Sequence, residues 1–198
     1  MDQPVTPVPS PEPSLEQGEP SLHAPVSSAA TISWLRDLMV SVLIAAVVIL
    51  FLYQPVRVEG TSMMPGLIDQ ERIFINKFAY RFGISDIERG DTVVFWYPGD
   101  PSKSFIKRII GVPGDKVLVK DGRVFVNDAA LDEPYVPGDY RDHVSTPPKV
   151  VPPEEYFVLG DHRSSSNDSR VWGTVPRRYI YGKASFVYWP LDRLGLLR

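Results

Sequence analysis

A stretch of 19 residues without a charged side chain, Leu38–Val56, constrains this chain more than any other feature. As an α-helix it would be roughly 28 Å long, close to the thickness of the hydrocarbon core of a bilayer. Pro55 near its end is expected to stop the helix, because proline has no backbone N–H to donate. A soluble helix would show a polar face, and here that face is reduced to Ser41. We therefore expect a single transmembrane anchor over residues 34–56.

Two other interpretations of this segment stay open, a cleaved signal peptide and a buried soluble helix. A signal peptide usually begins near the N-terminus with a basic segment and ends in small residues. Here a Pro-, Ser- and Glu-rich tract comes first, and Tyr-Gln-Pro ends the segment at residues 53–55. Residues 1–33 cannot bury enough apolar surface to offset their conformational entropy, so we expect a disordered tail. Arg36 and Arg57 flank opposite ends of the apolar stretch, so charge alone does not orient it.

The composition excludes several classes of function. The net charge of −3 argues against a nucleic-acid partner, because a phosphate-binding surface needs an excess of basic residues. The absence of cysteine excludes thiol catalysis, disulfides and cysteine-ligated zinc. The three histidines, His23, His143 and His162, lie far apart in the sequence, which disfavours a histidine-rich metal site.

Residues 57–198 predict a mainly β domain. The expected strands are 92–97, 117–120, 123–126, 156–159 and 184–189. Asp121-Gly122 joins two of these apolar runs, and this dipeptide is typical of a two-residue hairpin turn. Residues 128–155 are polar and contain six prolines, so we expect most of this segment to form a long surface loop.

A serine and a lysine in apolar surroundings are the candidate catalytic pair. Ser62 is followed by Met-Met-Pro at 63–65, and Lys107 lies in the apolar run 105–110. Serine is a poor nucleophile until a base takes its proton, and lysine can be that base only if burial lowers its pKa. Each residue also has a plain structural interpretation, a buried turn for Ser62 and a solvent-exposed edge strand for Lys107.

Arg108 follows Lys107, and the alternation of side chains along a strand directs the two cations to opposite faces. The flanking run is too apolar for both faces to be exposed, so at least one cation should be paired or buried. Residues 160–170 follow an expected strand and combine acids, bases and hydroxyls. Such a loop can pair with a buried cation such as Arg108 and can offer a hydroxyl to a neutral lysine amine. A solvated loop is the alternative.

Four motifs in order resemble bacterial type I signal peptidase, the membrane-bound leader peptidase. They are Gly-Thr-Ser-Met-Met-Pro at 60–65, Gly-Asp-Thr-Val-Val-Phe at 90–95, Phe-Ile-Lys-Arg-Ile-Ile-Gly-Val-Pro-Gly-Asp at 105–115 and Gly-Asp-His-Arg-Ser-Ser-Ser-Asn-Asp-Ser-Arg at 160–170. The resemblance extends over about residues 36–190, and the single-anchor cyanobacterial and Gram-positive members look most similar. It implies a β-rich Ser-Lys peptidase domain that follows one transmembrane helix. It also implies a serine endopeptidase that removes signal peptides after an Ala-x-Ala-like site.

The resemblance assigns the site residues of the family to individual positions of this sequence. Ser62 matches the nucleophile, Lys107 the general base, and Ser166 the serine that hydrogen-bonds the lysine amine. The charged residues that brace the site correspond to Arg108, Asp161, Asp168 and Arg170. The walls of the substrate pockets correspond to Val56, Val58, Met63, Leu67, Phe105 and Ile106.

The resemblance further implies the setting of the enzyme. Its partners would be the signal peptides of secreted preproteins and the lipid bilayer, with the secretion translocon as a further candidate and no nucleic acid. No metal or cofactor would be needed. The chain would be a single-pass protein of the inner, plasma or thylakoid membrane, with its catalytic domain on the extracytoplasmic side.

The chain departs from the family at three positions near the site, one of which is Gly66, where Thr usually follows the proline. Gly60 stands where some members carry a hydroxyl that completes the oxyanion hole, so a second donor beside the Ser62 N–H is unassigned. His162 stands where Asn is usual. Two other functions stay open, a Ser/His/Asp hydrolase that uses His162 and a membrane-anchored non-catalytic β-module, such as an inactive paralogue or envelope scaffold. The first is disfavoured because the side chains of the sequence neighbours Asp161 and His162 diverge, and the second because both dyad members are present.

Overall fold

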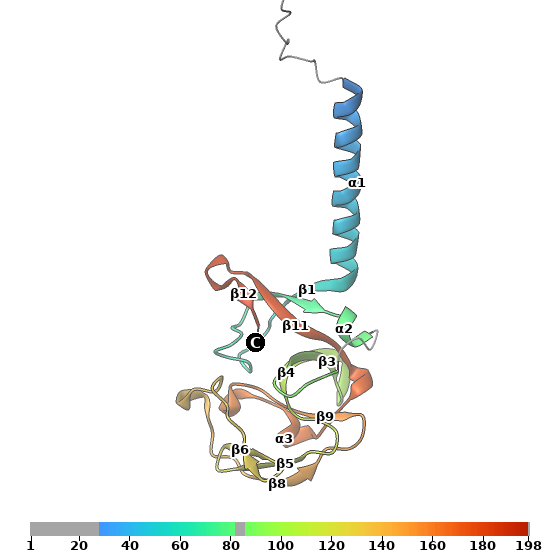
Figure 1. The fold of residues 1–198 in the computed structure, drawn as a ribbon. Coiled ribbons are helices and arrows are strands. Elements are labelled where there is room, and N and C mark those ends of the chain that lie inside the picture. The colour runs from blue at the N-terminus through green and yellow to red at the C-terminus, as the bar shows by residue number, and fades with distance from the viewer. Residues whose placement is uncertain (1–27, 82–85, 198) are drawn as a thin grey trace, which may run out of the picture. The chain divides into compact units, whose positions relative to one another are not determined.

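The computed structural model describes residues 28–81 and 86–197 of the chain, which are drawn in colour in Figure 1. Its helices are α1 (Ser28–Leu52), α2 (Phe78–Arg81) and α3 (Ser169–Trp172). Its strands are β1 (Tyr53–Arg57), β2 (Arg72–Asn76), β3 (Thr92–Tyr97), β4 (Asp100–Gly111), β5 (Lys116–Lys120), β6 (Arg123–Val126), β7 (Ala129–Ala130), β8 (Thr146–Val150), β9 (Glu155–Leu159), β10 (Val175–Pro176), β11 (Ile180–Trp189) and β12 (Gly195–Leu196). Strands predominate, which confirms the prediction of a mainly β fold.

Helix α1 covers most of the apolar segment, but its bounds differ from the predicted anchor. It begins at Ser28, inside the predicted tail, and ends at Leu52, so that residues 53–56 belong to strand β1. The early end follows from Pro55, because the residue before a proline is pushed towards extended backbone. The predicted tail falls mostly on residues 1–27, outside the described part of the chain.

The chain divides into two compact units, Met1–Ile44 and Ala45–Arg198, and every strand belongs to the second. Within residues 28–81 and 86–197, no helix combines the length and apolar character that a membrane span requires. The single anchor over residues 34–56 stays a prediction.

The larger sheet positions the candidate site. Among the described residues its strand order is β1-β2-β11-β3-β4-β9-β10, with β12 paired to β11. All its neighbouring strands are antiparallel. Strand β4 is internal and lies between β3 and β9, so Lys107 is opposite Val93 and Arg108 is opposite Leu159. This register brings Arg108 beside the end of β9, where the 160–170 loop begins.

The smaller sheet has the order β7-β6-β5-β8 among the described residues. Its β5–β6 hairpin confirms the predicted turn, since Asp121 and Gly122 both have the positive φ angles that such a turn requires. The prediction of a long surface loop over 128–155 is wrong in part. Residues Thr146–Val150 form β8, which pairs with β5, and Glu133 and Val136 are buried. Proline is tolerated in β8 because it is an edge strand.

Strand β4 contributes to hydrophobic clusters on both of its faces. Ile109 packs in a cluster with Val93, Phe95 and Val158, while the adjacent Ile110 packs with residues of β5 and β6. The residues from Lys107 to Gly111 are all buried. The strand is therefore covered on both sides at the point where its two cations lie, which excludes the exposed edge strand as the setting of Lys107.

Candidate active site

The structure brings Ser62 and Lys107 together. Lys107 Nζ lies 2.7 Å from Ser62 Oγ and 3.0 Å from the carbonyl oxygen of Ile106. Lys107 is 4% exposed, and its amine also lies 5.3 Å from the centre of the Phe105 ring. The only polar atoms recorded near this amine among the described residues are oxygens that can accept a hydrogen bond. The arrangement therefore suits a lysine that exchanges a proton with the serine hydroxyl.

The burial of Lys107 changes its acidity. Desolvation lowers the pKa of Lys107 from its ordinary value to about 8, and the smaller opposing influence of the carboxylates of Asp168 and Asp161 raises it. A free lysine amine at neutral pH is almost wholly charged, whereas one with a pKa near 8 is neutral in roughly one molecule in ten. Burial therefore favours a neutral Lys107 amine, able to accept a proton, close to physiological pH.

Ser62 lies in a tight turn that joins β1 to β2. The N–H of Met64 donates to the Thr61 carbonyl at 3.1 Å, and the N–H of Leu67 donates to the Met63 carbonyl at 2.9 Å. Gly60 enters this turn with a φ of +91°, which favours glycine over residues with a Cβ. The backbone itself therefore explains why glycine replaces a hydroxyl-bearing residue at this position.

Arg108 points away from Lys107 and forms a buried pair with Asp161. Its Nε and Nη2 donate to the two carboxylate oxygens of Asp161 at 2.9 and 2.7 Å, and its Nη1 donates to the Gly90 carbonyl at 2.8 Å. Its guanidinium also stacks 4.1 Å from the centre of the Tyr135 ring. The predicted pairing of a buried cation by the 160–170 loop is thus confirmed, and both cations of the β4 pair are buried.

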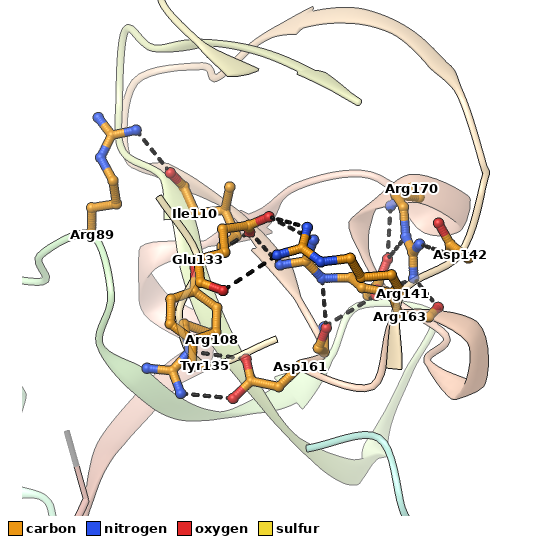
Figure 2. A network of polar contacts seen from close by, with 12 residues as sticks. Arg89, Arg108, Ile110, Glu133, Tyr135, Arg141, Asp142, Asp161, Arg163 and Arg170 are labelled. Atoms are coloured by element: carbon orange, nitrogen blue, oxygen red, sulfur yellow. Dashed lines mark hydrogen bonds and ion pairs between the residues drawn. The ribbon is translucent and has the colours of Figure 1, made fainter. Parts of the chain in front are cut away.

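Asp168 and Arg170 hold the far end of the same loop. Asp168 is fully buried and accepts a hydrogen bond from the Gly160 N–H at 3.1 Å, which ties the loop's two ends together. Arg170 donates to Asp168 through Nε at 2.8 Å and to the Arg163 carbonyl at 2.8 Å. Arg170 also pairs with Asp142, as Figure 2 shows. Asp168 and Arg170 therefore stabilise the conformation of the 160–170 loop.

A buried ion pair between Arg163 and Glu133 was missed by sequence reasoning. Both side chains are 1% exposed, and the two form a forked contact in the centre of Figure 2. Arg163 also donates to the Gly160 carbonyl at 3.0 Å. Glu133 belongs to the segment expected to be a surface loop, and its position in the charged Asp-Glu-Pro-Tyr sequence at 132–135 gave no separate signal of burial.

The 160–170 loop also contacts the turn that carries Ser62. The His162 N–H donates to the Ser62 carbonyl at 3.0 Å, and His162 Nδ1 lies 3.2 Å from the Thr61 carbonyl oxygen. The Thr61 and Ser165 hydroxyls are 3.2 Å apart. The His162 ring meets Tyr140 edge to face at 4.7 Å and makes no recorded contact with Ser62 Oγ. This placement disfavours a Ser/His/Asp triad that uses His162.

The hydrogen bond implied between Ser166 and Lys107 is absent from the structure. Ser166 Oγ is buried and has no hydrogen-bond partner among the described residues. The Lys107 amine instead donates hydrogen bonds to the Ser62 hydroxyl and the Ile106 carbonyl. Ser166 still lies close to the Ser62 backbone, because a Cβ built on Gly160 would contact both Ser166 Oγ and the Ser62 carbonyl oxygen.

A cavity of about 440 Å³ opens on the Ser62–Lys107 pair. Five of the residues predicted to form the pocket walls line this cavity: Val56, Val58, Met63, Phe105 and Ile106. The prediction for Leu67 is wrong, because Leu67 does not line this cavity but packs at 2% exposure in a core cluster with Val58, Met63 and Ile73.

Sequence reasoning missed the other lining residues, which are Arg57, Glu59, Val94, Ser104, Asn167 and Tyr181. Asn167 brings an amide to the cavity from the position between Ser166 and Asp168. Within residues 28–81 and 86–197, no group of three His, Cys, Asp or Glu side chains could hold a metal ion.

Comparison with known proteins gives one consistent result. The sequence model of a family described as signal peptidase, peptidase S26, matches residues 31–189. A signal peptidase I of Leptolyngbya laminosa is 35% identical and covers 95% of this chain and 94% of its own. A probable signal peptidase I-2 of Synechocystis is 40% identical and covers 83% of this chain and 78% of its own. A signal peptidase IB of Staphylococcus aureus is 37% identical and covers 81% of this chain and 91% of its own. These relatives agree with the resemblance that the four sequence motifs indicated.

Proposed function

Because this chain belongs to the signal peptidase family, peptidase S26, and is thus a serine peptidase that removes signal peptides, we propose that Ser62 and Lys107 perform the cleavage. The observation that carries the proposal is the 2.7 Å contact between Lys107 Nζ and Ser62 Oγ. A lysine amine that is buried and held against a serine hydroxyl has no evident structural purpose, since burying a charged amine costs stability.

The proposed reaction begins with the neutral Lys107 amine. It accepts the Ser62 hydroxyl proton as Oγ attacks the carbonyl carbon of the scissile peptide bond. The tetrahedral oxyanion is stabilised by backbone N–H groups, among them that of Ser62. The protonated Lys107 then gives its proton to the leaving amine, and an ester to Ser62 remains. Water then attacks this ester as Lys107 accepts its proton, the bond between the acyl carbon and Ser62 Oγ breaks, and Lys107 returns the proton to Oγ, which restores both groups.

The surroundings of the pair support these roles. The Ile106 carbonyl accepts a hydrogen bond from the amine, which leaves the amine's other positions to face Ser62. The 160–170 loop holds the Ser62 carbonyl through the His162 N–H, and Arg108, Asp161, Asp168 and Arg170 fix that loop. These four charged residues are proposed to position the reacting groups rather than to touch the substrate.

The apolar lining of the catalytic cavity supports a preference for small side chains. Val58, Met63 and Ile106 line the same cavity as Ser62. A site of this kind admits small residues one and three positions before the cut and excludes larger ones, in keeping with the Ala-x-Ala pattern of signal-peptide cleavage sites. The signal peptides of exported preproteins are accordingly the proposed substrates.

The membrane setting belongs to the same proposal. The apolar segment within 34–56 would anchor the chain by a single pass, with the catalytic unit on the extracytoplasmic side of a plasma, inner or thylakoid membrane. This setting would bring the site to the bilayer surface where signal peptides emerge, with the translocon as a candidate neighbour. The proposed chemistry uses protein groups and water alone.

Cleavage of a model preprotein tests the proposal. Wild type should release the mature protein with its new N-terminus directly after an Ala-x-Ala sequence, as mapped by mass spectrometry. Ser62→Ala and Lys107→Ala should each lose at least about a thousandfold in kcat. His162→Ala should retain activity within about tenfold, whereas a triad that uses His162 would lose it. Near-normal cleavage by Lys107→Ala would refute the dyad.

A further inference from the structure

A second cavity, of about 690 Å³, lies beside the catalytic cavity. The two cavities share Ser104 and Tyr181 in their linings. We call the second one the basic cavity, and its lining residues are Gln54, Lys77, Tyr80, Trp96, Ser104, Arg177, Arg178, Ile180 and Tyr181. No acidic residue belongs to this lining among the described residues. The mechanism above uses none of its cations.

The three cations of the basic cavity have only neutral partners recorded in the described part of the chain. Lys77 Nζ lies 5.8 Å from the centre of the Tyr181 ring. Arg177 donates to the Tyr80 carbonyl at 3.0 Å, and the Arg178 guanidinium lies 5.3 Å from the ring of Tyr179. Three positive charges around one cavity, with no acidic side chain in its lining within residues 28–81 and 86–197, create a strong attraction for an anion. Guanidinium groups match the geometry of phosphate oxygens in particular.

Aromatic side chains complete the wall. Trp96 is 43% exposed, and its ring lies 5.1 Å from that of Tyr181. Exposed tryptophan and tyrosine rings with a polar atom at one end are typical of protein surfaces at the headgroup level of a bilayer. An exposed indole beside cations that have only neutral partners in the described part of the chain therefore indicates an amphiphilic ligand that presents both a phosphate and apolar groups.

Gln54 lines the basic cavity and lies close in sequence to the end of the proposed membrane anchor. Gln54 is the second residue after Leu52, where helix α1 ends. Two extended residues span at most roughly 7 Å. This distance is shorter than the Debye length at physiological salt, so salt does not fully screen charges that far from the end of the helix. If the proposed anchor crosses the bilayer, the basic cavity therefore lies at headgroup depth, and in this respect the inference rests on the proposed function.

We propose that the basic cavity binds the phosphate group of an anionic phospholipid headgroup. A substrate peptide is the less suitable occupant, because the part of a signal peptide before the cut is apolar and ends in small residues. A bound headgroup would fix the neighbouring catalytic cavity at the lipid surface. Each basic side chain near an anionic lipid surface contributes about a fivefold change in affinity.

Lipid binding by the purified full chain in non-ionic detergent tests this proposal. Phosphatidylglycerol and phosphatidylcholine with identical acyl chains are titrated separately, and native mass spectrometry measures the fraction of protein that retains a lipid. We expect one saturable site that prefers phosphatidylglycerol. Lys77→Gln/Arg178→Gln should raise its Kd about 20-fold, because two of the three cations are lost. Arg177 is left in place because its hydrogen bond to Tyr80 supports the fold.

A matched control removes equal charge from the smaller sheet. Lys120 and Arg123 are both exposed, and Lys120→Gln/Arg123→Gln should leave the Kd for phosphatidylglycerol within about twofold of wild type. Equal affinity for the two lipids, or an equal loss in both double variants, would overturn the proposal. Displacement of phosphatidylglycerol by inorganic phosphate at similar concentration would assign the cavity to free phosphate. Displacement by a short acidic peptide would assign it to a protein ligand, and either result refutes the lipid.

The lipid assay is independent of cleavage. Ser62→Ala should retain phosphatidylglycerol with the wild-type Kd, because Ser62 does not line the basic cavity. Near-normal preprotein cleavage by Lys107→Ala, with the lipid preference of the wild type intact, would refute the dyad alone. Cleavage without lipid preference would refute the basic cavity alone.

Discussion

Gly160 lies directly against the backbone of Ser62, so that a Cβ at this position would stand 2.5 Å from the Ser62 carbonyl oxygen and closer still to Ser166 Oγ. Both are contacts that real Cβ atoms do not make. Gly160 follows strand β9, and the loop that begins here donates the His162 N–H to that same carbonyl. The absence of a side chain at Gly160 is thus what allows the loop and the nucleophile turn to meet.

Gly160→Ala should therefore push the Ser62 turn away from the loop. A displacement of about 1 Å of a reacting group typically costs about a hundredfold in rate, so we expect kcat to fall by that factor. Overpacking should also lower the free energy of unfolding by about 1 to 3 kcal/mol. Steady-state kinetics and urea unfolding measure the two effects. Gly138→Ala is the control, because nothing lies within 4 Å of its added Cβ, and it should change neither quantity. A fully active Gly160→Ala enzyme would contradict this placement.

Lys107→Met should make the protein more stable while it abolishes activity. Below pH 8 the folded protein holds a charged Lys107 in a site that disfavours charge, whereas the unfolded chain keeps that charge in water. The penalty is complete below pH 8, decreases as the pH rises, and vanishes above the unfolded pKa near 10.4. The variant, which has no such charge, should gain up to about 3 kcal/mol in the free energy of unfolding at pH 7.

Urea unfolding at pH 7 and at pH 10 checks this prediction. The gain should shrink at the higher pH, because wild-type Lys107 is then largely neutral in the folded protein. Lys120→Met, at an exposed position, should change the stability by no more than about 0.5 kcal/mol at either pH. A Lys107→Met variant less stable than wild type at pH 7 would show that the charged amine is well accommodated.

Glu133→Gln should leave the buried Arg163 without its counter-ion. The loss of one partner of a buried pair costs about 3 kcal/mol, because the remaining charge is desolvated and unpaired. Arg163 also holds the Gly160 carbonyl, so we expect kcat to fall with little change in KM. Thermal unfolding and steady-state kinetics measure these effects. Asp132→Asn, at the exposed neighbouring position, is the control and should leave both unchanged. Wild-type stability in Glu133→Gln would show that the pair does not brace the loop.

The sequence predicted the elements whose signals are local. The run 92–97 became β3 with the same bounds, and Asp121-Gly122 formed the expected hairpin turn because its positive φ angles are a property of those two residues. Apolar flanks predicted that Lys107 would be buried. Its contact with Ser62, across 45 residues, was predicted through the family resemblance rather than from any local pattern.

The sequence did not predict features that depend on distant partners. Prolines in 128–155 indicated a surface loop, but part of this segment pairs with β5 and forms strand β8. Glu133, in the same segment, is buried in an ion pair with Arg163. Leu67 looked like a pocket wall because it is apolar and near Ser62, yet the turn directs it into the core. Asn167 could have been found only by knowing that the 160–170 loop borders the catalytic cavity.

The pH dependence of kcat/KM tests the central claim most directly, because Lys107 must be neutral to accept the Ser62 proton. With the pKa of Lys107 lowered to about 8, kcat/KM for preprotein cleavage should rise about tenfold per pH unit up to pH 8 and level off above it. A limb centred near pH 6.5 would indicate a histidine base, and one that continues to rise beyond pH 10 would indicate a solvated lysine. Either result would contradict catalysis by a buried, neutral Lys107.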